Sequence, residues 1–276
     1  IGILWIAFPL WCQFLSKGHL EKQGILPNQK EQIKAYAKPM WQYFKNLANK
    51  QNHYLPPDNF QISPVEEVAT RTSPTNIGLY LLSCLAARDF EFINSAELYE
   101  SLSNCFETLC MLPKWHGHLY NWYHTETLEV LGEPYVSTVD SGNFFLHLSV
   151  LAQGLYDYVD SEPRLLKIES EIQKMLNNVD FSDLYSEKKQ LFYLGVRPGD
   201  EADSEHYYDM YMSEARATSY FAIARGDVPK VHWEKLSRPV FGYHGHIGFA
   251  SWTGTGFEYF MPTLVMPSYP GSAAYE

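Results

Sequence analysis

Apolar side chains recur at steps of three and four along much of the chain, which is the spacing of one helix face. The spacing predicts helices over residues 28–50, 74–85, 95–112, 140–159, 161–179 and 207–229. Strand signals are sparse, and the clearest one, residues 190–196, is short. We therefore expect an all-α fold, a helical toroid with its binding residues on the loops between long helices.

Short signals support several of these helix ends. Ser73 followed by Pro74 is an N-cap with proline at the first helical position. Asp140 and Ser141 are the expected N-cap residues of the 140–159 helix, and Gly226 closes the helix that precedes it. Residues 242–262 read as a glycine-rich loop that leads into an aromatic segment.

The first fifteen residues, IGILWIAFPLWCQFL, contain a single strongly polar side chain. They predict the end of a transmembrane helix (1–16), followed by a linker (17–27) and a helical domain (28–276). A bilayer core needs about 20 residues, so we expect the rest of the span to lie upstream. Basic residues directly after it predict a cytoplasmic domain. An ordinary buried helix is the alternative.

Composition limits the ligand. The net charge of -11 and the pI near 5.4 argue against nucleic-acid binding, which rests on clustered Lys and Arg. Four cysteines without a CxxC pair suggest neither a zinc ribbon nor a disulfide scaffold. The expected ligand is neutral or small.

Between His116 and His147 the chain combines aromatic rings with polar groups. A sugar ring needs this mixture, because its CH faces stack on aromatic rings while its hydroxyls require hydrogen-bonding partners. A carbohydrate site is the leading interpretation. The substrate-binding residues assigned from this stretch are Tyr120, Asn121, Trp122, Tyr123 and Asn143.

Three carboxylates are candidates for chemistry. Asp140 either caps a helix or projects into a cleft. Glu214 lies in a segment with few charges, so it is either a buried acid with a raised pKa or half of a structural ion pair. Glu258 follows the glycine-rich loop. Cleavage of a glycosidic bond normally uses two carboxylates, one on each side of the bond, which isolated acids among aromatics would suit.

Histidines at 116, 118, 124 and 147 invite a metal hypothesis, since HxH is a known ligand spacing. The stretch lacks a matching Asp or Cys cluster, so histidines that bind hydroxyls or lie satisfied in the core are favoured. We predict neither a metal nor a cofactor.

Several long motifs carry a family resemblance. They are LPPDNFQ with RTSPTNIGLYLL, GHLYNWYHTETLEVL with YVSTVDSGN, YYDMYMSEARATSYFAIARGDVPKVHW, and SWTGTGFEYFMP. Together they resemble the middle, glucoamylase-like domain of cyclic β-1,2-glucan synthase, which lies between a transmembrane glycosyltransferase part and a phosphorylase-like part. The resemblance covers nearly the whole chain.

The resemblance implies an (α/α)6 toroid that acts on linear β-1,2-glucan by anomer-retaining transglycosylation and closes it into a ring. Related β-1,2-glucanases hydrolyse instead. Matched to the family's SEAR motif, Glu214 would be one of two catalytic glutamates. Tyr208, Asp209 and Trp252, in the matching segments, would join the substrate-binding set.

The family's second glutamate lies in a Ser-Glu-Ser-Ala-Tyr-Asn segment that these 276 residues do not contain. The expectation is therefore a chain truncated at both ends, an incomplete toroid, and no turnover by residues 1–276 alone. His124 also stands where the family usually has Asp, and MYMSEAR replaces the commoner LLASEAR.

The resemblance further implies a β-glucan partner, neighbouring glycosyltransferase and phosphorylase-like domains in the same parent chain, and a bacterial inner-membrane location with the domain on the cytoplasmic side. Two other functions stay open. One is plain hydrolysis of β-glucan, and the other is a non-catalytic carbohydrate-binding module that holds glucan for its neighbours.

Overall fold

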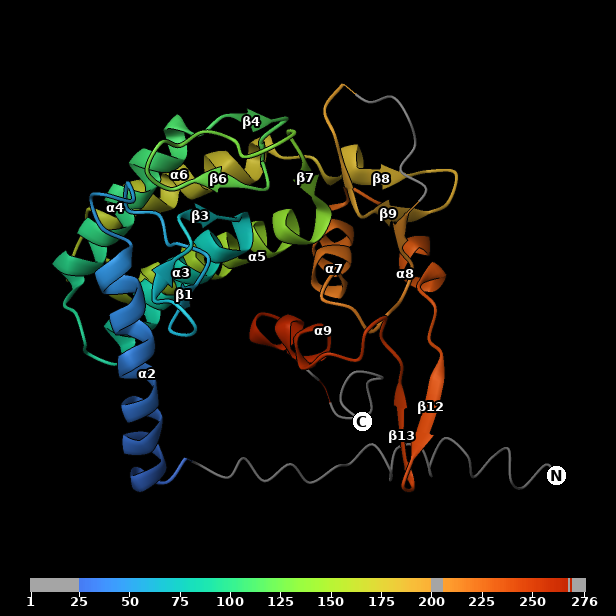
Figure 1. Ribbon diagram of the computed structural model, residues 1–276, viewed down its shortest axis with the longest axis horizontal. Coiled ribbons are helices and arrows are strands. Elements are labelled where there is room, and N and C mark those ends of the chain that lie inside the picture. The colour runs from blue at the N-terminus through green and yellow to red at the C-terminus, as the bar shows by residue number, and fades with distance from the viewer. Residues whose placement is uncertain (1–24, 200–205, 268, 270–276) are drawn as a thin grey trace.

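The computed structural model of the chain describes residues 25–199, 206–267 and 269. The helices of this part are α2 (Pro27–Leu47), α3 (Pro74–Asp89), α4 (Ser95–Met111), α5 (Thr138–Leu155), α6 (Leu165–Asn178), α7 (Arg216–Arg225), α8 (Val231–Lys235) and α9 (Gly256–Phe260). Figure 1 shows α3 to α6 gathered in one helical body, with α7 to α9 beside it.

Helix α5 lies at the centre of this body and packs against α3, α6 and α7 (Figure 1). Glycines let the backbones approach closely. A Cβ on Gly78 of α3 would lie 2.5 Å from His147 Nδ1, and one on Gly154 of α5 would lie 2.4 Å from Leu85 Cδ2. Early residues of α3 thus meet early residues of α5, and late residues meet late ones, so the two helices run parallel.

The N-terminal turn of α7 reaches the same end of α5. A Cβ on Gly142, near the start of α5, would lie 1.8 Å from Thr218 Oγ1 on α7. At the start of α3, Thr75 Oγ1 accepts a hydrogen bond from Asn143 Nδ2 at 3.2 Å. The N-termini of α3, α5 and α7 therefore meet at one end of the body, where the positive ends of helix dipoles favour carboxylates.

Helices α3, α5 and α7 form an inner set, and α2, α4 and α6 lie outside it. Helix α2 contacts α3, while α4 contacts both α3 and α6, and α6 contacts α5. Inner and outer helices thus alternate along the chain. This alternation is the arrangement expected of a helical toroid.

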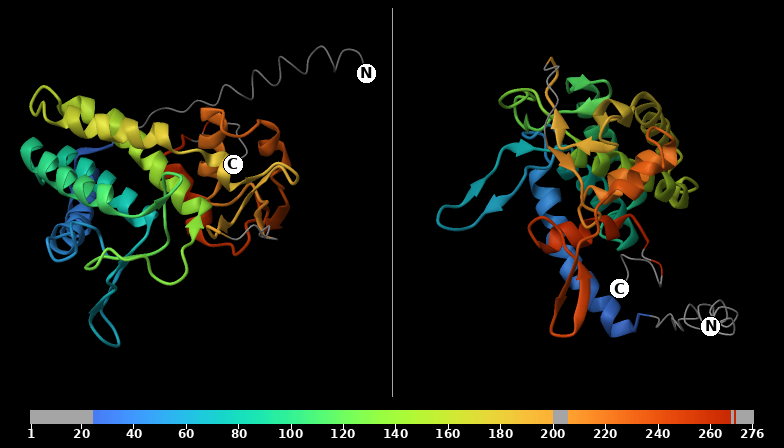
Figure 2. Two further views of the ribbon diagram at one scale, coloured as in Figure 1. Left: turned by 90° about the horizontal axis from the view of Figure 1, so that it is seen from above. Right: turned by 90° about the vertical axis from the view of Figure 1, so that its right-hand side faces the viewer.

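Short antiparallel strand pairs occupy the connections. The strands are β1 (Phe60–Gln61) with β2 (Glu67–Val68), β3 (Arg71–Thr72) with β6 (Tyr123–His124), β4 (Lys114–Trp115) with β5 (His118–Leu119), β7 (Val136–Ser137) with β10 (Gly195–Val196), the sheet β11 (Tyr207–Tyr208), β9 (Leu191–Tyr193) and β8 (Tyr185–Ser186), and β12 (Val240–Tyr243) with β13 (His246–Phe249). The β1–β2 and β12–β13 hairpins project from the helical body (Figure 2).

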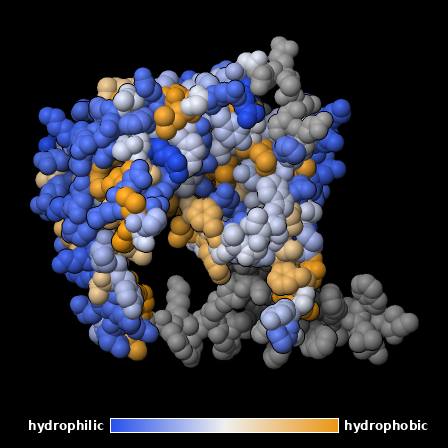
Figure 3. All heavy atoms as spheres, in the orientation of Figure 1, coloured by the Kyte–Doolittle hydropathy of each residue, from blue (hydrophilic) through white to orange (hydrophobic). Residues whose placement is uncertain are grey.

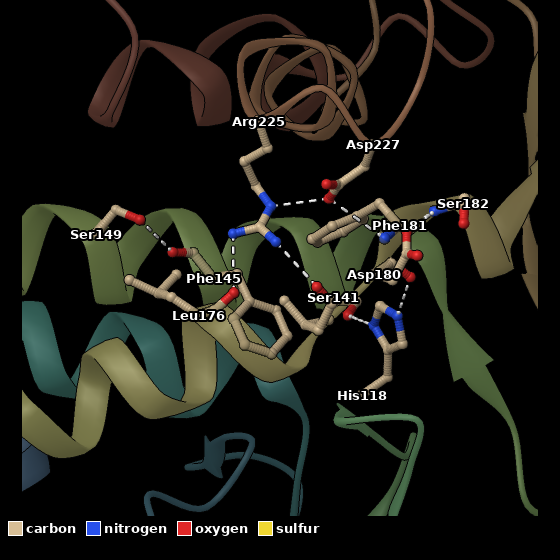
Figure 4. Close-up of polar contacts among 11 residues, drawn as sticks. His118, Ser141, Phe145, Ser149, Leu176, Asp180, Phe181, Ser182, Arg225 and Asp227 are labelled. Atoms are coloured by element: carbon tan, nitrogen blue, oxygen red, sulfur yellow. Dashed lines mark hydrogen bonds and ion pairs between the residues drawn. The ribbon is translucent and has the colours of Figure 1, made fainter.

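A polar network joins the far end of α7 to α6 (Figure 4). The Arg225 guanidinium donates to Asp227 Oδ2 at 2.8 Å and to the carbonyl oxygens of Leu176 and Val179, each at 2.9 Å. These carbonyls lie at the C-terminal end of α6, where a cation is favourable. The network fixes the direction in which α7 leaves the body.

The predicted helices are confirmed with three corrections at their starts. The helix expected from residue 161 begins at Leu165. Ser137, and not Asp140 or Ser141, caps α5, and its Oγ accepts from the backbone N–H of Asp140 at 3.3 Å. The helix expected over 207–229 begins only at Arg216, because residues 207–208 pair with β9 as strand β11. Gly226 ends α7 in the left-handed conformation, as expected.

The glycine-rich segment was also predicted incorrectly in part, since β12 and β13 form a hairpin within it. Its turn places His244 and Gly245 at positive φ, a conformation that two-residue hairpin turns require and that glycine adopts without strain. The β12–β13 pairing therefore depends on a glycine that composition alone assigned to a loop.

Only part of the predicted apolar face of α2 is buried. Trp41 is 6% exposed and Phe44 packs against the core, whereas Ile33 and Met40 are 43% and 69% exposed. Figure 3 shows a hollow between this helix and the β12–β13 hairpin, with apolar residues on both sides of it. Helix α2 therefore packs on α3 through only one edge of its apolar face.

The expected membrane segment, residues 1–16, lies outside the described residues, as does most of the linker. Among the helices that the structure describes, none combines the length and the apolar character needed to cross a bilayer.

Gly142→Ala should destabilise the chain, because the new methyl would collide with Thr218 Oγ1, Cβ and Cγ2, all within 2.5 Å. Overpacking of this kind costs about 1–3 kcal/mol, and the better helix propensity of alanine returns at most about 1 kcal/mol. Thermal or urea unfolding measures the difference. Gly154→Ala is the matched control, since its methyl would meet only the flexible end of Leu85. An equal stability for both variants would contradict the tight α5–α7 contact.

Candidate active site

Asp140 lies in the first turn of α5, half-buried, at the end of the body where the inner helices begin. Ser137 supplies the cap, so the carboxylate of Asp140 is not needed for that purpose. A carboxylate in a first turn is stabilised by the unpaired backbone N–H groups around it. The cap interpretation of Asp140 is therefore wrong, and projection of its carboxylate into a cleft stays a prediction.

Glu214 lies in the turn directly before α7 and is half-buried. Burial, together with the negative charges of Asp140 and then Glu258, raises the pKa of Glu214 to about 7. The alternative of a structural ion pair is not found, because no ion pair within the described residues involves Glu214. Arg216, two positions on, instead donates to Met212 Sδ and to the Tyr259 carbonyl oxygen. Glu214 can therefore hold a proton near neutral pH, as a general acid must.

Glu258, in α9, is the third carboxylate of this group, and its oxygens are already used. They accept hydrogen bonds from Ser251 Oγ (3.0 Å), Thr253 Oγ1 (2.6 Å) and N–H (3.2 Å), and Thr255 N–H (3.1 Å) and Oγ1 (3.2 Å). Although burial acts in the opposite direction, these bonds lower the pKa of Glu258 to about 2. We therefore assign Glu258 to holding the 251–255 loop and to raising the pKa of Glu214, and not to proton transfer.

That loop carries Trp252, which completes an aromatic surface. The indole stacks on the Tyr208 ring, with centroids 5.3 Å apart and planes 8° apart, and its Nε1 donates to Asp209 Oδ1 at 3.0 Å. Burial, then the charges of Glu214 and Asp140, raise the pKa of the Tyr208 hydroxyl. The three residues therefore lie together beside the acids, and a ring surface next to carboxylates is what a sugar would bind.

Tyr135, one of the aromatic residues of the 116–147 stretch, belongs to the same region, as does Arg197, which the sequence did not single out. Burial raises the pKa of Tyr135, Arg197 lowers it, and Asp140 raises it again. The Arg197 guanidinium lies 5.6 Å from the centre of the Tyr135 ring. A Cβ on Gly195 would lie 2.3 Å from the Tyr135 hydroxyl, so the β7–β10 pair holds this phenol in place. The position of Tyr135 between aromatic and polar residues was the available signal, and Arg197 had none.

Two assigned substrate-binding residues are corrected. Tyr123 is fully buried, and its hydroxyl donates to the Pro113 carbonyl oxygen at 2.6 Å and accepts from the Tyr120 N–H at 2.8 Å. Asn143 is 3% exposed and bonds to Thr75. Both side chains hold the fold together and cannot touch a ligand.

The other residues from that stretch lie in the connection that precedes α5. Tyr120 is half-buried and packs against the core. Trp122 is half-buried, and the Arg71 guanidinium lies 5.2 Å from its ring. The side-chain oxygen of Asn121 is buried without a hydrogen-bond partner among the described residues. No contact places these three beside Glu214, so their substrate role stays a prediction.

The histidines of the HxH motif make structural contacts. His116 Nδ1 lies 2.8 Å from Asp183 Oδ2. His118 is fully buried, and its two ring nitrogens lie 2.5 Å from Ser141 Oγ and 3.1 Å from the Asp180 carbonyl oxygen (Figure 4). No cluster of metal-ligating side chains occurs in the part of the chain that the structure describes.

Known proteins resemble this chain in sequence and in structure. The cyclic β-(1,2)-glucan synthase NdvB of Rhizobium meliloti is 27% identical over an alignment of 394 residues, which covers 98% of this chain and 14% of the synthase. The endo-β-1,2-glucanase of Chitinophaga pinensis, solved with sophorotriose and glucose, has a TM-score of 0.71 at 16% identity, over 85% of this chain and 60% of that one. The endo-β-1,2-glucanase of Talaromyces funiculosus, in complex with sophorose, has a TM-score of 0.65 at 11% identity, over 85% and 57%. No protein-family model matches the chain.

The structural similarity confirms the predicted fold, an all-α toroid of the glucoamylase-like type. The similarity to NdvB confirms the resemblance to cyclic β-1,2-glucan synthase that the motifs indicated. This chain spans about one seventh of the length of that relative.

Proposed function

We propose that this chain is a transglycosylase domain of the glycoside-hydrolase type, which acts on linear β-1,2-glucan and closes it into a ring. The observation that carries the proposal is Glu214, whose raised pKa of about 7 keeps its carboxyl protonated near neutral pH. The stacked Tyr208 and Trp252 rings beside it suit a sugar. The synthase named for the sequence relative supports the choice of substrate.

In the proposed reaction Glu214 donates its proton to the glycosidic oxygen while the bond from that oxygen to the anomeric carbon breaks, and the reducing-side part of the chain leaves as a shorter linear glucan. In the retaining scheme an enzyme carboxylate forms a bond to the anomeric carbon of the part that stays. The hydroxyl at the non-reducing end of that part then attacks the anomeric carbon, displaces the carboxylate, gives its proton back to Glu214, and closes the ring. We assign Asp140 to binding the substrate hydroxyls beside Glu214 and to raising the pKa of Glu214.

We propose that the chain works within a larger synthase, next to glycosyltransferase and phosphorylase-like domains. Its coverage of one seventh of the NdvB synthase supports this. The membrane anchor and the cytoplasmic side of the bacterial inner membrane stay predictions, because they depend on residues 1–16.

The products formed from linear β-1,2-glucan by the full-length protein test the proposal. Transglycosylation by this domain should give cyclic glucan together with a shorter linear glucan, and mass spectrometry distinguishes the ring because it is lighter by one water than linear glucan with the same number of glucose units. Shorter linear products alone would support hydrolysis, the reaction in the names of the two glucanases. Binding without any new product would identify a carbohydrate-binding module and contradict the proposal.

A further inference from the structure

A surface groove of about 560 Å³ lies beside the candidate active site but on the other side of the β11–β9 pair. Leu191, Leu194, Tyr207 and Trp252 contribute apolar surface to it, and Lys189 and Asp209 contribute charged groups. Its volume is within the range of about 300–1,000 Å³ that is usual for ligand sites.

Strand alternation explains why this groove is separate from the carboxylates. Successive side chains of a strand point to opposite faces. Tyr208 pairs with Phe192 of β9, and burial, then the charges of Glu214 and Asp140, raise the pKa of its hydroxyl. The face of the sheet that carries the Tyr208 side chain is therefore the inner one. Tyr207, one residue earlier, therefore faces outward into the groove.

Trp252 connects the two faces. It stacks on Tyr208, which belongs to the inner face, and it also lines the outer groove. Strand β11 is the edge strand of its sheet in the described residues, so the indole can lie past this edge and be reached from both sides. Its side chain is 44% exposed.

We propose that this outer groove is a second glucan-binding site, which holds a distant part of the same long β-1,2-glucan whose reacting bond lies at Glu214. The inference rests on the proposed function. The rings of Tyr207 and Trp252 can contact the CH faces of a sugar, and the charged groups of Lys189 and Asp209 can bind its hydroxyls. This combination suits a neutral polyhydroxylated chain. A glucan that passes over Trp252 contacts both sites at once, so the groove selects long chains over short ones.

Calorimetric titration of the full-length protein with long linear β-1,2-glucan and with sophorotriose tests the groove. The trisaccharide is the short-chain comparison. Tyr207→Ala should weaken binding of the long glucan roughly three- to tenfold, as expected for the loss of one aromatic contact, and leave sophorotriose binding unchanged. Lys189→Glu, at an exposed position that does not disturb the core, should show the same selective loss.

Tyr220→Ala is the matched control, because Tyr220 is a 53% exposed tyrosine on α7 outside the groove. If both groove variants lost affinity equally for the two glucans, or lost none for either, the proposed second glucan-binding site would be overturned. The assignment of Glu214 would not be affected. If the groove variants bound both glucans normally but no longer bound a neighbouring domain of the same protein, the groove would instead be a docking site for that domain. If neither glucan binds the unaltered full-length protein, the proposed function itself is contradicted.

Discussion

Glu214→Gln should lower the cyclisation rate of the full-length protein by about 10²–10⁴-fold, the contribution typical of a positioned general acid. Glutamine keeps the size of the side chain but has no transferable proton. Because the substitution removes a buried acid and not a ring or a cap, glucan binding and the unfolding temperature should stay close to those of the unaltered protein. Product formation from linear β-1,2-glucan measures the loss, and calorimetric titration measures the binding.

Glu107→Gln is the control for this experiment, since Glu107 is an exposed glutamate on α4. It should cyclise glucan at the normal rate. Unchanged cyclisation by Glu214→Gln would refute the catalytic assignment, and loss of both cyclisation and glucan binding would point to a binding role alone.

The helical body was predictable because its signals are local. A helix face repeats over a few residues, and the Ser73–Pro74 start of α3 is a direct consequence of capping chemistry, with Asn76 N–H bonded to Ser73 Oγ at 3.2 Å. The start of α5 was predicted less well, because Ser137, Asp140 and Ser141 are all competent caps. Only the pairing of β7 with β10, which ends at Ser137, decides between them.

The candidate acids were predictable as residue types but not as a group. Glu214 stood out because few charges surround it in the sequence. What brings it to Asp140 is the close packing of α5 on α7 at Gly142 and Thr218, which the sequence shows only as a small residue and a hydroxyl 76 positions apart, from 142 to 218. The role of Glu258 depends on the hydrogen bonds that the 251–255 loop donates to its carboxylate. The glycines of that segment gave no sign of these bonds in the sequence.

Composition was a weaker guide to which side chains contact the ligand. Tyr123 and Trp122 are neighbours in one aromatic segment, yet Tyr123 is fully buried and Trp122 is half-buried. Trp122 lies directly before strand β6 and Tyr123 begins it, and the sequence does not say which side of this segment faces the core. Within a strand, adjacent residues point in opposite directions. The same alternation separates Tyr207 from Tyr208.

Asp140→Asn should change both the rate of cyclisation and its pH dependence. After burial, the negative charge of Asp140 is the next cause of the raised pKa of Glu214, so a neutral amide should lower that pKa from about 7 toward its ordinary value. A general acid works only while protonated, so activity falls as the pH rises through its pKa. The alkaline limb of the profile should therefore move to lower pH, by the amount that the Glu214 pKa falls.

The rate should also fall on the acid side of that limb, where Glu214 stays protonated in both proteins. A hydrogen bond to a charged group contributes about 1.5–3 kcal/mol, so losing the carboxylate that binds substrate hydroxyls should lower kcat/KM by roughly 10- to 100-fold. Asp160→Asn is the matched control. It lies beyond the C-terminal end of α5, a helix whose 18 residues span about 27 Å, whereas Asp140 lies in the first turn. A lower rate with no shift of the alkaline limb would leave Asp140 as a substrate contact alone. An unchanged rate and an unchanged alkaline limb would show that Asp140 neither binds the substrate nor affects the pKa of Glu214.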